Sequence, residues 1–321
     1  MKLASIISKL NDEKIFLRGN SELEIKKISS PEKADENSLC VIWDKKALEL
    51  LDLNIPIVAP KEFFEDKRNG IICENPKALL PKLLEIFESH SEKLTGIHKN
   101  AFISESAKIS DKAYIGAFAF IGENCEIGEG TVIEPNVTLL RNVKIGKNCL
   151  IHSGAVIGCD GFGFVRENEK IVKIPQNGGV EIFDDVEIGA CTTIDRGAMN
   201  DTIIGEGTKI DNHVQVGHNV KIGKYCIICS MSGIAGSSII EDYVTISVQA
   251  GITDHVTVGK NSIIAGRSGV TNDVPEGSVL SGFPARPHNQ AKRALVLAAD
   301  LPDMFKRLRK LEKKFEDLQN K

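Results

Sequence analysis

An aliphatic residue recurs at every sixth position over most of the chain, and this repeat constrains the fold more than any other feature. A period of six matches neither an α-helix nor the alternation of a β-strand, so it predicts a succession of short strands separated by turns. The first ladder comprises Ile97, Ile103, Ile109, Ile115, Ile121, Ile127, Ile133, Leu139, Ile145, Ile151 and Ile157. After a partial return at Ile182, Ile188 and Ile194, the second comprises Ile204, Ile210, Val216, Ile222, Ile228, Ile234, Ile240, Ile246, Ile252, Val258, Ile264 and Val270.

Small residues occupy fixed places within the repeat. Glycine often follows the aliphatic residue, as at Gly116 and Gly217, and a small residue often stands four positions after it, as at Cys125, Cys149 and Cys226. One inward aliphatic side chain per hexad, followed by a bend that glycine tolerates, predicts a hexapeptide-repeat β-helix. In the hexapeptide proteins that this pattern resembles, three hexads close one triangular, left-handed coil. Residues three hexads apart then stack about 4.8 Å apart, and the three cysteines pack inside.

The hexad is absent from both ends of the chain. Residues 1–95 show helical spacing at 3–10 and 76–90 and strand-like runs at 39–43 and 55–59, which predicts an α/β cap.

Residues 96–284 carry the repeat, broken by a long insertion between Ile157 and Ile182. Residues 285–321 are expected to be helical, with a heptad seam that needs a partner helix and a kink or restart at Pro302. The predicted fold is mainly β, a left-handed parallel β-helix with an α/β cap and C-terminal helices. The seam residues are Leu297, Leu301, Met304, Leu308, Leu311, Phe315 and Leu318.

Net charge, hydropathy and cysteine usage argue against several classes of protein. With 40 Lys and Arg against 44 Asp and Glu, the net charge of -4 gives no chain-wide reason to bind nucleic acid. No apolar run is long enough for a transmembrane segment, and residues 1–10 lack a signal-peptide core, so we expect a cytoplasmic protein. The eight cysteines are scattered through the 321 residues and are expected to be reduced thiols.

Polar residues that break the repeat are the candidates for chemistry, and they concentrate between Asp211 and Asn219. His218 follows an inward valine by two positions, on a turn, and Gly236 lies three hexads further along. Stacking therefore brings an imidazole beside a backbone amide that has no side chain. Acyl transfer needs this pair, a base for the nucleophile's proton and an N–H donor for the oxyanion. His255, two coils and one position after His218, is expected on the same face but too far away to be the same base.

Four segments in a fixed order carry a more specific resemblance. They are Asp160 to Phe164 (DGFGF), Lys173 to Gln176 (KIPQ), Thr193 to Ala198 (TIDRGA) and Asp211 to Asn219 (DNHVQVGHN). With them, nearly the whole chain resembles the UDP-3-O-(3-hydroxyacyl)glucosamine N-acyltransferases of lipid A biosynthesis. The resemblance implies transfer of an (R)-3-hydroxyacyl chain to the 2-amine of a UDP-3-acylated glucosamine, with an ester or an amide at sugar position 3.

The resemblance also implies site residues. His218 would be the general base, the Gly236 amide would bind the oxyanion, and His255 would assist substrate binding or the transition state. No metal is expected. The substrate-binding positions are Asp211, Asn212, Gln215, Asn219 and Gln176 in the β-helix, and Trp43 and Asp44 in the cap.

The cap departs from the family pattern where uracil is gripped. Val41 and Ala47 stand where the family has aromatic residues, and Asp44 stands where it has Asn. Trp43 either takes over the stacking in this uridine-binding domain or is a buried core residue.

The donor and the partners follow from the same resemblance. No permanently bound cofactor is expected, because the acyl chain arrives on the 4'-phosphopantetheine of acyl carrier protein. Family members are homotrimers with active sites between neighbouring β-helices, and the C-terminal seam fits such an assembly. The last 36 residues hold ten Lys or Arg against five acids, so this helical surface either steers the acidic carrier protein or is simply a solvated face.

Three other functions remain open at this stage. An acetyl-CoA-dependent acetyltransferase acting on a nucleotide sugar or small amine would use the same base and oxyanion donor. His213, His218 and His255 are similar to the ligands of hexapeptide-fold carbonic anhydrases, although their order along the chain is wrong for that zinc site. A non-catalytic trimeric scaffold is the third. The other histidines, His90, His98, His152 and His288, are expected to be structural or on the surface.

Overall fold

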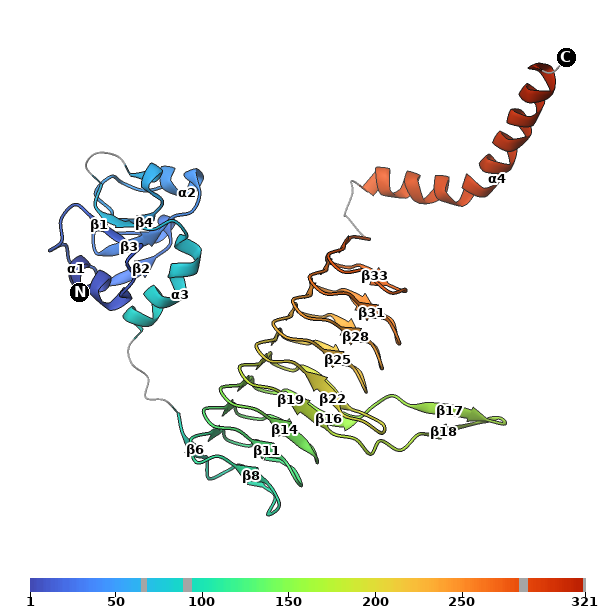
Figure 1. Ribbon diagram of the computed structural model, residues 1–321, viewed down its shortest axis with the longest axis horizontal. Coiled ribbons are helices and arrows are strands. Elements are labelled where there is room, and N and C mark those ends of the chain that lie inside the picture. The colour runs from blue at the N-terminus through green and yellow to red at the C-terminus, as the bar shows by residue number, and fades with distance from the viewer. Residues whose placement is uncertain (65–67, 89–93, 283–287, 320–321) are drawn as a thin grey trace. The chain divides into compact units, whose positions relative to one another are not determined.

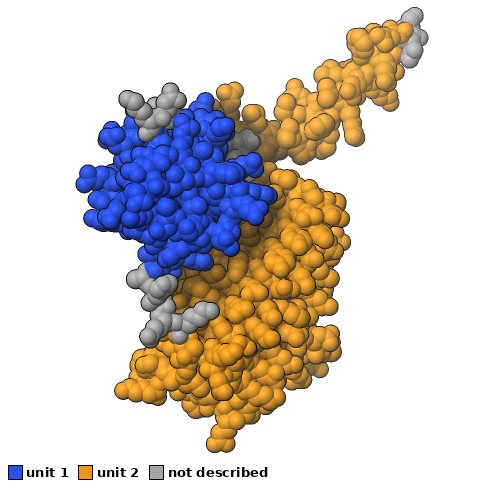
Figure 2. All heavy atoms as spheres, turned by 60° about the vertical axis from the view of Figure 1, so that its left-hand side comes forward, with its two compact units in different colours: residues 1–93 blue, residues 94–321 orange. Residues whose placement is uncertain are grey.

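The computed structural model describes residues 1–64, 68–88, 94–282 and 288–319. The chain divides into two compact units, residues 1–93 and residues 94–321, which Figure 2 distinguishes by colour. The expected domain boundary at 284/285 lies outside the described residues, as do His90, Arg286 and Lys321.

The first unit is a five-stranded sheet with helices on both faces (Figure 1). The strand order is β1-β5-β4-β3-β2, and only the β1/β5 pair is antiparallel. Its elements are α1 (Leu3–Leu10), β1 (Phe16–Arg18), β2 (Lys27–Ser29), η1 (Pro31–Lys33), β3 (Ser38–Val41), α2 (Lys45–Glu49), β4 (Ile57–Ala59), η2 (Lys61–Phe63), β5 (Gly70–Ile72) and α3 (Pro76–Phe87).

The α/β character expected of this unit is confirmed, with shorter elements than expected. The predicted strand over 39–43 is β3, which ends at Val41, and the predicted helix over 76–90 is α3, which ends at Phe87. Buried residues of α1 and α3 pack on one side of the sheet, where Leu3, Ile6 and Leu83 are fully buried. Residues of α2 pack against a second cluster that contains Ile42 and Ile57.

The second unit is built around three parallel sheets that form the faces of a prism. The nine-stranded face consists of β7 (Phe102–Ile103), β10 (Phe120–Ile121), β13 (Thr138–Leu139), β16 (Val156–Asp160), β21 (Thr193–Arg196), β24 (Gln215–Val216), β27 (Gly233–Ile234), β30 (Gly251–Ile252) and β33 (Gly269–Val270). The eight-stranded face consists of β8 (Lys108–Ile109), β11 (Glu126–Ile127), β14 (Val143–Ile145), β19 (Val180–Ile182), β22 (Thr202–Ile204), β25 (Lys221–Ile222), β28 (Ile239–Ile240) and β31 (Thr257–Val258). The ten-stranded face consists of β6 (Gly96–Ile97), β9 (Tyr114–Ile115), β12 (Val132–Ile133), β15 (Leu150–Ile151), β20 (Glu187–Ile188), β23 (Lys209–Ile210), β26 (Ile227–Ile228), β29 (Thr245–Ile246), β32 (Ile263–Ile264) and β34 (Val279–Leu280).

Counting by three hexads predicts the register correctly. Val216 pairs with Ile234, and Ile234 pairs with Ile252, each 18 residues further on. The inward aliphatic residues form one continuous core, most of them fully buried. Cys125, Cys149 and Cys226 lie in this core as predicted, and all eight cysteines of the chain are free thiols. Burial raises the pKa of the Cys149 thiol to about 11, which keeps it protonated and unreactive.

Two irregular coils interrupt this stacking. Ile157 pairs with Ile194, 37 residues later, because the intervening chain leaves the prism as an antiparallel hairpin of β17 (Phe164–Glu167) and β18 (Lys170–Lys173) (Figure 1). The next coil is also long, since Ile194 pairs with Val216 at a separation of 22 residues.

The C-terminal region is one helix, α4 (His288–Gln319), which bends part-way along its length (Figure 1). The predicted kink matches this bend, because Pro302 removes a hydrogen bond and its ring crowds the preceding turn. The seam residues Leu297, Leu301 and Phe315 are exposed along the helix.

The predicted fold class is confirmed as a mainly β, left-handed parallel β-helix of about 13 turns, preceded by an α/β unit and followed by a helix. None of the helices within the described ranges has the length and hydropathy of a membrane span.

Candidate active site

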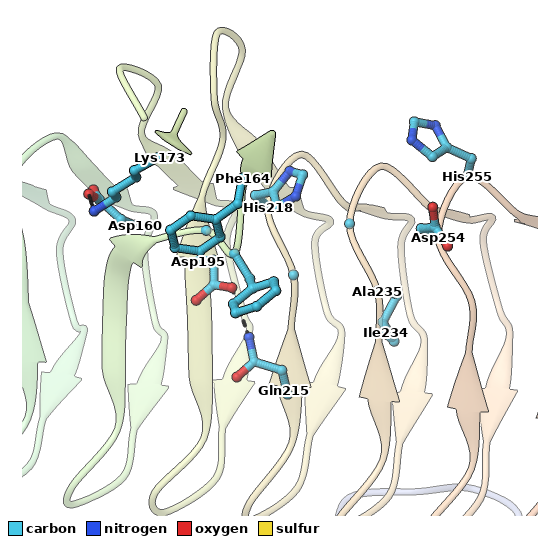
Figure 3. Close-up of a pocket in the computed structure, with 14 residues that line it drawn as sticks. Asp160, Phe164, Lys173, Asp195, Gln215, His218, Ile234, Ala235, Asp254 and His255 are labelled. Carbon is cyan, nitrogen blue, oxygen red and sulfur yellow. Dashed lines mark hydrogen bonds and ion pairs between the residues drawn. The ribbon is translucent and has the colours of Figure 1, made fainter. Parts of the chain in front are cut away.

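A cavity of about 630 Å³ opens at the corner where the chain leaves the nine-stranded face (Figure 3). Four of the predicted site residues line it, His218, Gly236, His255 and Gln215. Regular coils therefore bring residues from successive turns of the β-helix to one place, as counting by hexads predicts.

The predicted juxtaposition of His218 and Gly236 is the centre of this cavity. A methyl group built on Gly236 would lie 2.7 Å from both Cε1 and Nε2 of His218. Absence of a side chain at 236 thus leaves space beside the imidazole edge that faces away from the backbone. The Gly236 N–H donates no hydrogen bond to any group in the described ranges, so it remains available for a developing oxyanion.

The Asn219 side chain fixes which nitrogen of His218 is basic. Asn219 Oδ1 accepts from the Ala198 N–H at 3.0 Å, and its Nδ2 donates to the Asn200 carbonyl at 3.0 Å, so the amide cannot be reversed. Oδ1 therefore faces Nδ1 of His218, at 3.1 Å. Since an amide oxygen only accepts, Nδ1 carries the hydrogen and Nε2 keeps its lone pair on the Gly236 side.

Asn219 does not line the cavity itself. The sequence predicted Asn219 as a substrate contact. In the structure its Oδ1 and Nδ2 both hydrogen-bond to backbone groups, and Oδ1 also contacts His218. The long coil of residues 194–216 and the residues after it supply these partners.

His255 lies further along the same cavity, on an exposed corner in the left-handed region with φ of 58°. No hydrogen bond or ion pair of its ring is found among the described residues. Its imidazole is thus available to a ligand that extends from His218 along the prism.

Sequence reasoning missed several other residues that line the cavity. The insertion and the long coil supply Asp160, Gly161, Phe162, Phe164, Lys173 and Asp195, and a regular coil supplies Asp254 beside His255. Gly161 packs so closely on His218 that a methyl group there would lie 2.4 Å from the histidine Cβ. Lys173 Nζ binds Asp160 Oδ2 at 2.5 Å and ties the hairpin to the prism. The motifs containing the residues of the insertion and the long coil were visible, but the broken repeat gave no register for placing them.

Gln215 and Asp195 are hydrogen-bonded to each other in the cavity wall below His218 (Figure 3). Gln215 Nε2 donates to Asp195 Oδ2 at 3.0 Å, and Gln215 Oε1 accepts from the Thr193 hydroxyl. Burial raises the pKa of the Asp195 carboxyl, while the hydrogen bond from Gln215 and the attraction of His218 in its protonated form oppose the rise.

Asp211 and Asn212 lie at the other end of β24 and do not line the cavity. Asp211 Oδ2 accepts from the Ser230 N–H at 3.1 Å, and Asn212 Oδ1 accepts from the Ala190 N–H at 2.6 Å, so both side chains join neighbouring coils. His213 shares this corner, which separates it from His218 by one side of the prism.

Gln176 is 2% exposed, and its Oε1 has no hydrogen-bond partner in the described ranges. Its Nε2 donates to the Ile174 carbonyl at 3.0 Å, and its own carbonyl accepts from Arg141 at 3.1 Å. This residue anchors the base of the insertion and does not line the cavity.

In the first unit, Trp43 is 45% exposed, so the alternative that it is a buried core residue is wrong. Lys77 Nζ lies 5.3 Å from the centroid of the Trp43 ring, in a cation–π contact. The exposed part of the ring remains an accessible aromatic surface. Asp44 Oδ1 accepts from the Ala47 N–H at 2.8 Å and caps α2. Val41 is buried, so it offers nothing to a ligand at the surface.

Comparisons with known proteins agree with this geometry. Family models described as "Bacterial transferase hexapeptide (six repeats)" and "GMPPB C-terminal domain" match residues 201–236 and 97–162. A UDP-N-acetylglucosamine acyltransferase of solved structure, from Francisella novicida, is 33% identical with a TM-score of 0.54, over 62% of this chain and 73% of that chain. The chain belongs to the hexapeptide-repeat acyltransferases.

Within these acyltransferases, the resemblance predicted from the four motifs is confirmed. A UDP-3-O-acylglucosamine N-acyltransferase of Methylorubrum extorquens is 50% identical over 166 residues, which are 52% of this chain and 47% of that protein. The enzyme of the same name from Janthinobacterium sp. (strain Marseille) is 42% identical over 188 residues, 58% of this chain and 54% of that protein. The matches thus span about half the length of these relatives.

Within the described ranges, no three His, Cys, Asp or Glu side chains cluster as metal ligands. His213 and His218, the close pair of the zinc alternative, point from opposite ends of β24. The site described around His218 and Gly236 uses neither histidine as a metal ligand.

Proposed function

We propose that the protein transfers an (R)-3-hydroxyacyl chain from the 4'-phosphopantetheine thioester of acyl carrier protein to the 2-amine of a UDP-3-acylated glucosamine. The acyl group already at position 3 is an ester or an amide. A single observation carries the proposal. The basic Nε2 of His218 lies beside the N–H of Gly236, which has no hydrogen-bond partner within the described ranges. The N-acyltransferase relatives support the choice of acceptor.

His218 Nε2 would remove a proton from the acceptor nitrogen as it attacks the thioester carbonyl. The carbonyl oxygen would gain negative charge and accept a hydrogen bond from the Gly236 N–H. Collapse of this intermediate breaks the carbon–sulfur bond, and the proton on His218 passes to the departing thiolate. Asn219 holds the imidazole in the tautomer that this sequence requires.

The remaining predicted contacts belong to the same proposal. His255 would bind the donor or acceptor further along the cavity, and Gln176 would act through the insertion that it anchors. Asp211 and Asn212 would act from a neighbouring subunit's side of the site, since they face away from this chain's cavity. Trp43 would stack on uracil, which its exposed ring supports, with Asp44 beside it.

A homotrimer is supported by the outer surfaces of the prism. Outward positions of the eight-stranded face carry Lys108, Glu126 and Lys144, as expected of a solvated face. On the nine-stranded face, the outward position just before the inward residue is uncharged in every strand: Phe102, Phe120, Thr138, Val156, Thr193, Gln215, Gly233, Gly251 and Gly269. On the ten-stranded face Ile227 and Ile263 are exposed. The uncharged positions of the nine-stranded face and the exposed isoleucines of the ten-stranded face suit three prisms around one axis.

The acyl carrier protein donor is supported by the basic surface of α4, where Arg307, Lys310, Lys313 and Lys314 gather. Such a surface complements an acidic carrier protein. Catalysis in the cytoplasm, without a permanently bound cofactor, is part of the proposal.

Mass spectrometry of products from a panel of donors and acceptors tests it. We expect product from hydroxyacyl carrier proteins with UDP-3-O-acylglucosamine or its 3-N analogue. His218→Ala should keep the fold and the oligomeric state but lose about 10²- to 10⁴-fold in kcat, the usual contribution of a general base. Turnover with acetyl-CoA alone would instead support the acetyltransferase, and wild-type turnover by His218→Ala would overturn the mechanism.

A further inference from the structure

Asp195 reaches the cavity because its coil is longer than a regular one. β21 (Thr193–Arg196) pairs with β16 (Val156–Asp160), and the register shifts between Ile157 and Cys159. The strand therefore runs on past the inward Ile194, where regular coils turn. Asp195 is the first residue beyond that point, and it lines the cavity together with His218.

The carboxylate of Asp195 lacks a cationic partner, although cations stand close by. Among the described residues, no ion pair includes Asp195. Lys173 is bound to Asp160, and Arg196 Nε donates to the Gly158 carbonyl at 2.7 Å and lies 3.6 Å from Asp160. The nearby lysine and arginine charges therefore already face a different carboxylate, Asp160.

One oxygen of Asp195 is held, and the other is open. Gln215 Nε2 donates to Oδ2 at 3.0 Å, and the Thr193 hydroxyl on the far side of the same amide keeps the Gln215 NH₂ group turned toward Asp195. No donor to Oδ1 is found within the described ranges. A partly buried, oriented carboxylate with a free oxygen is costly for the chain alone, and a cationic ligand would offset that cost.

The acceptor of the proposed reaction supplies such a group. A sugar amine binds protons readily near neutral pH, and its ammonium form carries one positive charge and three N–H donors. We propose that Asp195 is the subsite for the acceptor's amine, where its carboxylate accepts a hydrogen bond from the ammonium and selects an amine over a hydroxyl at the same sugar position. This inference rests on the proposed amine acceptor.

The bound ammonium releases one proton to solvent, and the amine nitrogen forms a bond to the thioester carbon. His218 Nε2 takes a second proton from that nitrogen, the carbon–sulfur bond breaks, and the sulfur receives the proton from His218. The products are an amide, a thiol and one proton. Asp195 stays ionised throughout and stabilises the positive charge on nitrogen before and during attack, which an attacking hydroxyl does not develop in the same way.

Asp195→Asn tests the subsite, because Asn keeps the shape and can still accept from Gln215. With a UDP-3-acylated glucosamine as acceptor, kcat/KM should fall about 10- to 100-fold, the range of one charge-assisted hydrogen bond. With the matched acceptor that has a hydroxyl at position 2, kcat/KM should not fall. The protein should be at least as stable to urea as the wild type at neutral pH, because an unpaired buried charge has been removed.

Asp254→Asn is the matched control, since it removes an exposed carboxylate from the same cavity. Asp254 lies three coils from Asp195 along the prism, and its exposed, screened charge should change the amine reaction by about threefold or less. An equal loss on both acceptors by Asp195→Asn, or a loss of stability, would show a structural role and overturn the proposal. An equal loss in both variants would show a general field effect and overturn it too.

Calorimetry without a donor separates this inference from the proposed reaction. Wild-type protein should bind UDP-glucosamine more tightly than UDP-glucose, and Asp195→Asn should lose that preference. If the preference is present but no hydroxyacyl carrier protein is used, the proposed reaction fails while the amine subsite holds. If acylation of the amine occurs but the preference is absent or survives in Asp195→Asn, the subsite fails alone.

Discussion

Gly236→Ala is the sharpest test of the site geometry, because it adds one methyl group beside the general base. The new Cβ would lie 2.7 Å from Nε2 and Cε1 of His218 and 3.1 Å from its Cδ2, closer than carbon atoms pack in proteins. The imidazole must swing away, which stretches its 3.1 Å contact with Asn219 and fills the space required by the thioester. We expect kcat to fall by about 10²- to 10⁴-fold, as on loss of the general base.

Stability should change little in the same variant. Gly236 is not among the glycines in the left-handed region, so alanine meets no backbone strain there. Overpacking costs about 1–3 kcal/mol in a tight core, but here the obstructing group is a half-buried ring on rotatable bonds, so the cost should be near the lower limit. The smaller entropy of the unfolded chain with alanine offsets about 0.4–1 kcal/mol of it.

The assay is steady-state acyl transfer from a hydroxyacyl carrier protein, with urea unfolding followed by circular dichroism on the same samples. Gly233→Ala is the matched control in the same coil, because a methyl group there meets no atom of this chain within 4 Å. Its oligomeric state is measured alongside, because Gly233 lies on the face proposed to pack in the trimer. Wild-type turnover by Gly236→Ala would refute the placement of the reacting thioester beside His218. Equal losses in the two variants would show that the effect belongs to the coil and not to the imidazole.

Two further predictions concern the hydrogen-bond partners of His218 and of His152. Asn219→Ala should lower kcat by about 10- to 100-fold, because either tautomer of His218 then becomes accessible and the Ala198 N–H loses its acceptor. An unchanged kcat would show that Asn219 does not set the tautomer. Burial by itself would lower the pKa of His152, but its hydrogen bonds with Glu187 and Glu134 outweigh burial and raise it. The stability from this cluster is therefore complete below the ordinary value of 6.5 and is lost as pH rises through the higher folded value. Urea unfolding is measured from pH 5.5 to 8.5, about one to two units on either side of 6.5, and should show this loss of stability in the wild type and not in His152→Ala. Identical pH profiles for the two proteins would contradict the prediction.

The register of the prism follows from the sequence because its period is strict. Each hexad supplies one inward aliphatic residue, and backbone pairing between coils fixes the separation at 18 residues, so His218 and Gly236 can be placed by counting. The same count accounts for the buried cysteines and places His255 along the same edge.

Adjacency in the sequence was a poorer guide than the period. Asp211 and Asn212 stand close to His218 in the chain, yet β24 lies between them and carries them to another corner. One side of the prism is about as long as that stretch, so neighbours in the polar segment diverge in space. The accessibility of Trp43 also depended on packing, since its strand ends two residues earlier, at Val41.

The sequence by itself thus determined the β-helix. With the three-hexad coil that its resemblance to hexapeptide proteins implies, it also determined the pairing of His218 with Gly236, because identical coils repeat the same backbone geometry. Only the tertiary structure placed Asp195, Lys173 and the partners of Asn219. These residues come from the insertion and from the 22-residue coil, where the period is lost and side-chain packing, not counting, sets their positions.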